Sequence, residues 1–223
     1  MGKLILYHGS PEIVTQPLFG KGKVYNDYGQ GFYCTLDLLM AREWASNENR
    51  DGFVNKYEID TTDLSILNLS EYTILHWLTI LVKHRIFRMS TPVMKKGVEW
   101  LEKNYSIDLS SYDIITGYRA DDSYFSFTRA FLNNEISLEQ LSYAMKLGKL
   151  GEQIVLKSTK AFEKIKYINY EKVDSSIYYV KRKTRDDEAR KAYLEELDKK
   201  DLKGLYMRDI IIEEVQPNDP RLR

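Results

Sequence analysis

Short runs of alternating or continuous apolar residues in the first quarter of the chain predict β-strands. Residues 3–8 are an apolar run followed by a Gly-Ser-Pro sequence, as expected for a strand that enters a turn. Glycines and turn formers fill residues 19–31, and residues 32–35 then predict a second short strand. Residues 53–59 alternate in the manner of a half-buried strand. The N-terminal quarter is therefore expected to be rich in strands.

Apolar residues at helical spacing predict that the middle of the chain is mostly helical. The predicted helices cover residues 38–46, 71–87, 92–105, 123–132 and 137–146. Asp37 is the expected N-cap of the first helix, and Pro92 suits the first turn of the third. Ser137 and Gln140 fit a capping box at the start of the fifth.

Strands return in the second half of the chain. Residues 112–118 predict a buried strand, residues 151–157 a clear strand, and residues 161–173 are strand-like at their end. A charged, solvated helix is expected over residues 185–200, whereas residues 207–215 are apolar and ambiguous between helix and strand. With strands at both ends of a helical middle, and no repeat or linker, the pattern indicates a single α+β domain.

Composition and charge exclude several classes of protein. No apolar run approaches the roughly 20 residues that a membrane span requires. Cys34 is the only cysteine, which excludes an intrachain disulfide and a cysteine-based zinc site and suits a reducing cytoplasm. With only three histidines, a multi-histidine metal site is not expected either. The 33 basic residues balance 33 acidic ones, so the overall positive charge that favours non-specific nucleic-acid binding is absent.

Three separated segments place a polar or aromatic side chain beside glycine, where a ligand can approach the backbone closely. They are residues 6–10 around His8, residues 28–35 around Tyr33 together with Trp44 further on, and residues 151–155 around Glu152. Taken singly, each has an ordinary explanation. The histidine suits a structural or solvated role, the glycines a turn, the tryptophan the core, and the glutamate a surface charge.

Together, the three segments resemble the motifs of the ADP-ribosyltransferase superfamily. Leu-Tyr-His-Gly-Ser at residues 6–10 is similar to the first motif of its poly(ADP-ribose) polymerase and diphtheria-toxin-like branch, which is marked by a His-Tyr-Glu triad. Gly-Gln-Gly-Phe-Tyr at residues 29–33, followed by residues 41–44, resembles the second motif, and Glu-Gln-Ile-Val at residues 152–155 the third. Residues 117–125, with the run to Lys157, also resemble an uncharacterised bacterial family whose members are often encoded beside a small partner protein.

This resemblance implies a fold and a domain plan. It implies an ADP-ribosyltransferase-like split β-sheet core, with a mainly helical insertion at about residues 60–146 between the second and third motifs. About residues 176–223 would then be a C-terminal extension of the same single domain, which spans residues 1–223.

The resemblance also implies roles for individual residues, with NAD as co-substrate and no metal. Glu152 would hydrogen-bond the ribose 2′-hydroxyl and stabilise the positive charge that develops when nicotinamide leaves. His8 would bind the adenosine-side ribose, with Ser10 beside it, and the backbone of Gly9 would hold the nicotinamide amide. Tyr33 would stack on the nicotinamide ring, and Trp44 would complete the stack.

A further candidate is Arg119 with the residues that follow it. Arg119 could meet the NAD pyrophosphate as a bidentate donor, and Asp122 could face the acceptor. An alternative of equal weight is a turn in which Asp121 or Asp122 caps the helix that starts near residue 123. By contrast, His76 and His84 are expected to be structural.

The sequence departs from the family pattern at two positions. Residue 41 is alanine where the polymerase branch often has a serine that contacts the amide, so nicotinamide recognition is expected to differ. Residue 150 is leucine, so the Glu/Gln-x-Glu arrangement of the arginine-modifying branch is absent.

The expected function is mono-ADP-ribosylation of a macromolecule by a bacterial, cytoplasmic enzyme, since nothing in the single domain suggests the apparatus for polymer formation. The resemblance further implies the toxin of a toxin–antitoxin pair, with a small antitoxin protein as partner. An NAD glycohydrolase and a non-catalytic module that binds NAD, ADP-ribose or a protein remain as alternatives. Protein, tRNA and DNA remain open as acceptors.

Overall fold

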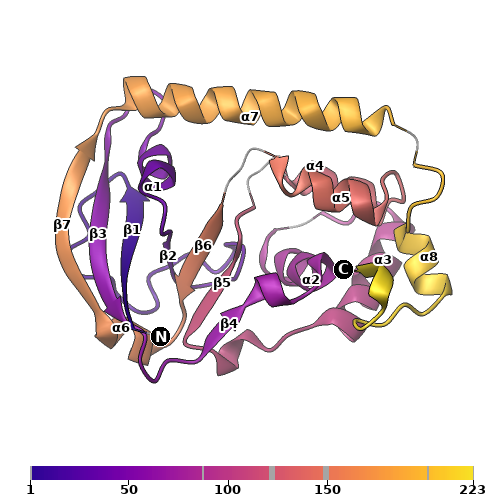
Figure 1. The fold of residues 1–223 in the computed structure, drawn as a ribbon, viewed down its shortest axis with the longest axis horizontal. Coiled ribbons are helices and arrows are strands. Elements are labelled where there is room, and N and C mark those ends of the chain that lie inside the picture. The colour runs from indigo at the N-terminus through magenta and orange to yellow at the C-terminus, as the bar shows by residue number, and fades with distance from the viewer. Residues whose placement is uncertain (1, 87, 121–123, 148–150, 200, 223) are drawn as a thin grey trace.

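The computed structural model describes residues 2–86, 88–120, 124–147, 151–199 and 201–222. It contains two β-sheets and helices α1 to α8, which confirms the predicted α+β class. In Figure 1 one sheet lies at the left, most helices lie at the right, and the long helix α7 runs along the top over both parts. The second sheet lies between these two parts.

The first sheet has the strand order β1-β3-β7 and is antiparallel throughout. Strands β1 (Lys3–Ser10) and β3 (Gly52–Asp60) confirm two predicted strands and extend each of them slightly. Strand β7 (Ile165–Val173) is the predicted strand-like end of residues 161–173.

The second sheet has the order β2-β6-β5-β4. Strands β2 (Phe32–Cys34), β5 (Ile114–Tyr118) and β6 (Glu152–Leu156) lie where strands are predicted. The sequence pattern misses β4 (Ile66–Asn68), a three-residue strand that pairs in parallel with β5. Because β4 and β5 fall within residues 60–146, the expected insertion supplies two strands of this sheet as well as helices.

A β-bridge between Tyr7 and Thr35 joins the two sheets. The Tyr7 amide donates to the Thr35 carbonyl and the Thr35 amide donates to the Tyr7 carbonyl, both at 2.9 Å. An apolar cluster that includes Leu6, Tyr57 and Ile154 fills the space between the sheets. This arrangement brings the end of β1 next to β2.

Helix α1 (Leu38–Ala45) packs directly on the first sheet. The Asp37 side chain accepts hydrogen bonds from the amides of Leu39 and Met40, as predicted for an N-cap. The close approach depends on Gly9, because a Cβ there would lie 2.7 Å from the Ala45 nitrogen and 2.9 Å from the Trp44 Cβ. The first motif is thereby fixed against the helix that carries Trp44.

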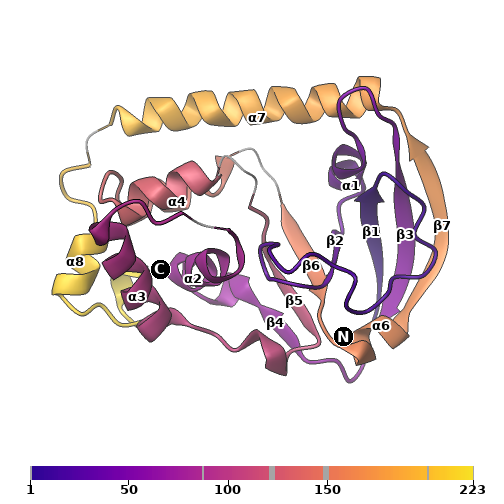
Figure 2. The same ribbon diagram turned by 180° about the vertical axis from the view of Figure 1, so that it is seen from behind.

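The helical part, which Figure 2 shows from behind, surrounds the larger apolar core. Its helices are α2 (Ile74–His84), α3 (Pro92–Tyr105), α4 (Tyr124–Leu132) and α5 (Leu138–Ala144). The Ser137–Gln140 capping box is confirmed, and α3 has the predicted bounds. Helix α2 starts later than predicted, because a separate 3-10 turn at Leu69–Glu71 precedes its N-cap Thr73.

Three further helices complete the chain. The short helix α6 (Thr159–Lys164) was not predicted, and α8 (Met207–Ile212) resolves the ambiguous C-terminal segment as helix. Helix α7 (Ser175–Leu197) begins ten residues before the predicted start at residue 185, because Asp174 caps it by accepting from the Ser176 amide. Along the described ranges, no helix is both long and apolar enough to cross a membrane.

Candidate functional site

A cavity of about 690 Å³ lies where the end of β1, the turn before β2, helix α1 and the segment after β5 meet. Six of the seven site residues predicted from the sequence line it, and they come from three distant parts of the chain. These residues are His8, Gly9, Ser10, Tyr33, Trp44 and Arg119.

His8 is held at the end of β1 by a hydrogen bond between its Nδ1 and the Tyr33 carbonyl oxygen, at 2.7 Å. Its ring also packs against Phe32, with 4.5 Å between ring centres. Burial lowers the pKa of His8, and the bond to Tyr33 only partly opposes this, so the ring is neutral at pH 7. Because a carbonyl oxygen can only accept, Nδ1 carries the proton, and Nε2 is left as a hydrogen-bond acceptor.

The hydroxyl of Tyr33 is engaged within the protein. It donates to the Gly29 carbonyl at 2.6 Å and accepts from the Tyr28 amide at 3.0 Å, and burial raises its pKa. Lys157, which follows β6, fixes the same turn by donating to the carbonyls of Tyr28 and Gln30 at 2.7 and 2.6 Å. The turn therefore holds Tyr33 rigidly, and its ring rather than its hydroxyl is available to a ligand.

Arg119 and Trp44 face each other in the cavity. The guanidinium carbon of Arg119 lies 4.4 Å from the centre of the Trp44 ring, a cation–π contact. The Trp44 Nε1 is buried, and it donates to no atom within the described ranges. Asp121, Asp122 and residue 123, for which the sequence offers a capping or acceptor-facing role, lie outside the described residues.

Glu152 stands apart from the six residues that line the cavity. It is the exposed first residue of β6, paired with Tyr118, and its carbonyl accepts from the Thr35 Oγ1 at 3.2 Å. Its carboxylate forms no hydrogen bond or ion pair with any residue that the structure describes. The next residue, Gln153, does line the cavity. The predicted triad thus lies on three strands, β1, β2 and β6: His8 and Tyr33 line the cavity, and Glu152 directly precedes the cavity residue Gln153.

Asp27 is a cavity residue that the sequence analysis missed. Its side chain is buried, and its Oδ2 accepts from the Ala120 amide at 2.9 Å and from the Gln153 Nε2 at 2.8 Å. Its Oδ1 lies 3.4 Å from the Arg85 Nη1. Burial raises the pKa of Asp27, against these hydrogen bonds and the charges of Arg85 and Arg119. Asp27 therefore ties the turn before β2 to β6, to α2 and to the segment after β5.

No sequence signal identifies this carboxylate, because an aspartate in a run of turn formers ordinarily caps the turn. Its partners Gln153 and Arg85 were missed because each acts through a contact with a residue far away in the sequence. Candidate metal ligands do not gather in the same way, since the described residues hold no group of three or more His, Cys, Asp or Glu side chains suited to a metal ion.

Comparison with known proteins gives a family but no relative of known activity. No curated protein and no solved structure matches the chain. A family model described as "Protein of unknown function (DUF3990)" matches residues 4–167, which include every residue of the cavity. Helices α7 and α8 lie beyond the matched segment. This match covers well over half of the chain, which therefore belongs to the DUF3990 family.

Proposed function

We propose that the protein is a mono-ADP-ribosyltransferase that takes ADP-ribose from NAD and transfers it to a macromolecule. One observation carries the proposal: residues of the first two motif-like segments converge, with Arg119, on a single cavity. The third segment contributes Gln153 to that cavity, and Glu152 directly precedes Gln153 in the chain.

The chemistry of the cavity fits the parts of NAD. Its volume of about 690 Å³ lies within the range of about 300–1,000 Å³ that is common for ligand pockets. Arg119 can pair with the pyrophosphate through a planar guanidinium. The acceptor nitrogen Nε2 of His8 suits a ribose hydroxyl, and the rings of Tyr33 and Trp44 suit the cationic nicotinamide ring.

In the proposed reaction, the bond between the ribose carbon and the nicotinamide nitrogen breaks, and both electrons leave with nicotinamide. The ribose carbon becomes positively charged, and a nucleophile of the acceptor attacks it and loses a proton. Glu152 would stabilise this charge and take up the proton, because a carboxylate is suited to both tasks. Tyr33 takes no part in proton transfer, since its hydroxyl is engaged with Tyr28 and Gly29.

The test is incubation of the purified protein with NAD labelled in its ADP-ribose part and with a host-cell lysate. We expect label in macromolecules with the wild-type protein and none with Glu152→Gln. Glu163→Gln is the matched control, because Glu163 is an exposed glutamate on α6, away from the cavity. Normal NAD turnover by Glu152→Gln would refute the role of Glu152. Nicotinamide release without labelled macromolecules would indicate a glycohydrolase.

A second candidate function is a non-catalytic module that binds NAD or ADP-ribose. It is favoured by the position of Glu152, which is not among the residues that line the cavity. In that case the wild-type protein would leave NAD intact, and ADP-ribose would bind equally to the wild type and to Glu152→Gln.

A small antitoxin, the partner implied by the family resemblance, would be sought by co-purification with the product of the neighbouring gene.

A further inference from the structure

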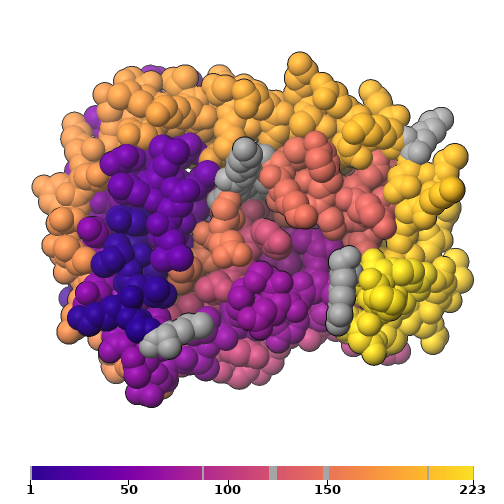
Figure 3. Space-filling view, in the orientation of Figure 1, coloured from indigo at the N-terminus to yellow at the C-terminus, as the bar shows by residue number. Residues whose placement is uncertain are grey.

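Helix α7 lies outside the segment matched by the family model, yet it contacts both parts of the molecule. In the space-filling view of Figure 3, its orange residues run along the top over the sheet side and the helical side. Its first half packs against α1, where Arg42 lies 5.6 Å from the Tyr178 ring. Its second half packs against α4, where the rings of Tyr193 and Phe127 are 3.9 Å apart.

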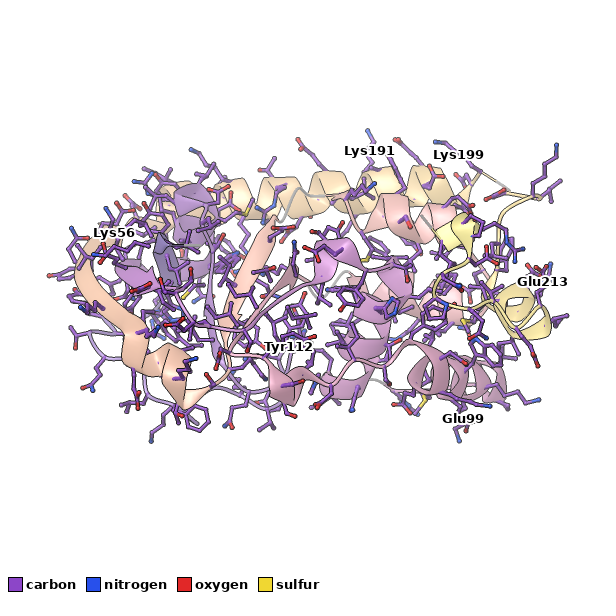
Figure 4. The ribbon with its side chains drawn as sticks, turned by 60° about the horizontal axis from the view of Figure 1, so that its bottom comes forward. Lys56, Glu99, Tyr112, Lys191, Lys199 and Glu213 are labelled. Carbon is purple, nitrogen blue, oxygen red and sulfur yellow. The ribbon has the colours of Figure 1, made fainter. Side chains whose placement is uncertain are left out.

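Arg185 differs from the other basic residues of this helix. Lys191 of the helix and Lys199, just beyond its end, are both labelled in Figure 4 and are exposed. The side chain of Arg185 is only 15% exposed and forms an ion pair with Glu43 of α1, whose side chain is 6% exposed. Its Nη1 also donates to the sulfur of Met40 at 3.1 Å. A buried cation from α7 therefore neutralises a buried carboxylate on α1.

Glu43 is also close to the cavity. It precedes Trp44, the residue on whose ring Arg119 stacks. Burial raises the pKa of Glu43; the positive charges of Arg185, Arg119 and Arg182 oppose this rise. Glu43 is thus paired directly with Arg185 of α7, and it is the neighbour in the chain of Trp44, on which Arg119 stacks; the charges of both arginines act on it, as does that of Asp186.

We propose that Arg185 is a positioning residue: by pairing with Glu43, it keeps Arg119 stacked on Trp44, where the guanidinium faces an anionic ligand of the cavity. Removal of Arg185 leaves a buried carboxylate without its closest partner, which is strongly unfavourable. Arg119 is then drawn from Trp44 toward Glu43. Replacing Glu43 by glutamine removes this attraction. The anion is the pyrophosphate of NAD or ADP-ribose, and this part of the inference rests on the proposed function.

The position of Arg119 can be measured without any ligand. The Nε–H proton of Arg119 lies next to the Trp44 ring, so its NMR signal is displaced by the ring current, and Arg119→Lys identifies it by its disappearance. We expect Arg185→Gln to move this signal toward that of an exposed arginine, and Glu43→Gln in the same chain to restore it. Arg190→Gln is the control, because Arg190 is an exposed arginine of the same helix and is not among the charges that act on Glu43.

An unchanged signal in Arg185→Gln, or a signal that the double variant does not restore, would overturn the inference. If Arg185→Gln alone does not fold, the comparison of the wild type with the double variant decides. Retention of the displaced signal supports the role through Glu43, and its loss shows that Arg185 holds Arg119 by another route.

Calorimetric titration with ADP-ribose separates this inference from the proposed function. We expect binding to weaken about tenfold in Arg185→Gln, which corresponds to ~1.4 kcal/mol, and to return in the double variant. If the wild type binds no ADP-ribose while the NMR pattern holds, the proposed function fails and the positioning role stands. If the wild type binds but the NMR pattern fails, the positioning role is wrong, and the binding of ADP-ribose that the proposed function requires stands.

Discussion

The substitution Gly9→Ala tests whether the packing of α1 on the first sheet shapes the cavity. A methyl group at this position would lie 2.7 Å from the Ala45 nitrogen, 2.9 Å from the Trp44 Cβ and closer still to the Ala41 carbonyl oxygen. Non-bonded heavy atoms prefer a separation of about 3.5 Å, so α1 must move outward by roughly 1 Å. The nearest contacts are backbone atoms of a helix, which cannot rotate away.

Overpacking of this kind costs about 1–3 kcal/mol, and alanine recovers about 0.4–1 kcal/mol because it restricts the unfolded chain. Because the clash is with backbone atoms, the upper half of the overpacking range applies, about 2–3 kcal/mol. The net loss of about 1–2.6 kcal/mol corresponds to a fall in Tm of about 2–10 °C for a chain of this length. Differential scanning fluorimetry measures this shift. Gly2→Ala is the matched control: a Cβ there meets nothing within 4 Å, and we expect a change below about 0.5 kcal/mol. Equal Tm values for the two variants would refute the packing argument.

Three further predictions follow from named contacts. Burial lowers the pKa of all three histidines below the ordinary value. As the pH falls below about 6.5, the unfolded chain therefore binds protons before the folded one, and the free energy of unfolding decreases. His8→Gln should reduce this pH dependence when unfolding is measured from pH 7.5 to 5. Tyr193→Ala removes a buried ring packed on Phe127 and should cost about 3 kcal/mol in chemical unfolding, whereas an unchanged midpoint would mean that α7 is not anchored there. Glu171→Gln breaks a partly buried, bidentate ion pair with Arg42 and should cost about 1 kcal/mol, and a much larger loss would show that this pair is coupled to other contacts.

Elements with a long or strongly patterned sequence were predicted with nearly correct bounds. Helix α3 matches its prediction because a proline starts it and a regular apolar face runs through it. Strand β4 escaped prediction because three residues are too few to show a period, and it exists only because β5 pairs with it. The early start of α7 was missed because its first turns depend on the cap at Asp174 and on packing against α1, not on an apolar stripe of its own.

The residues of the cavity also fall into a group that could be predicted from the sequence and a group that could not. His8, Gly9, Ser10 and Tyr33 could be predicted because they lie in short motif-like segments that contain glycine, and Trp44 because it follows the second of these segments. Asp27, Gln153 and Arg85 could not, because their partners lie far away in the sequence: Asp27 meets Gln153, and Arg85 reaches Asp27 from the end of α2. Such contacts arise only when the chain has folded. The same holds for Arg185, whose partner Glu43 is on another helix.

The bridge between Tyr7 and Thr35 gives the molecule a local reporter of sheet separation. Next to it, His8 donates to the Tyr33 carbonyl across the same junction. Apolar side chains such as Leu6 and Ile154 also lie between the sheets, and apolar contacts have no fixed direction. A tilt of one sheet against the other would therefore have to break this bridge and the neighbouring bond between His8 and Tyr33, two residues that line the cavity. Since the Tyr7 and Thr35 amides lose their partners together in such a motion, their deuterium uptake would record how often the cavity opens.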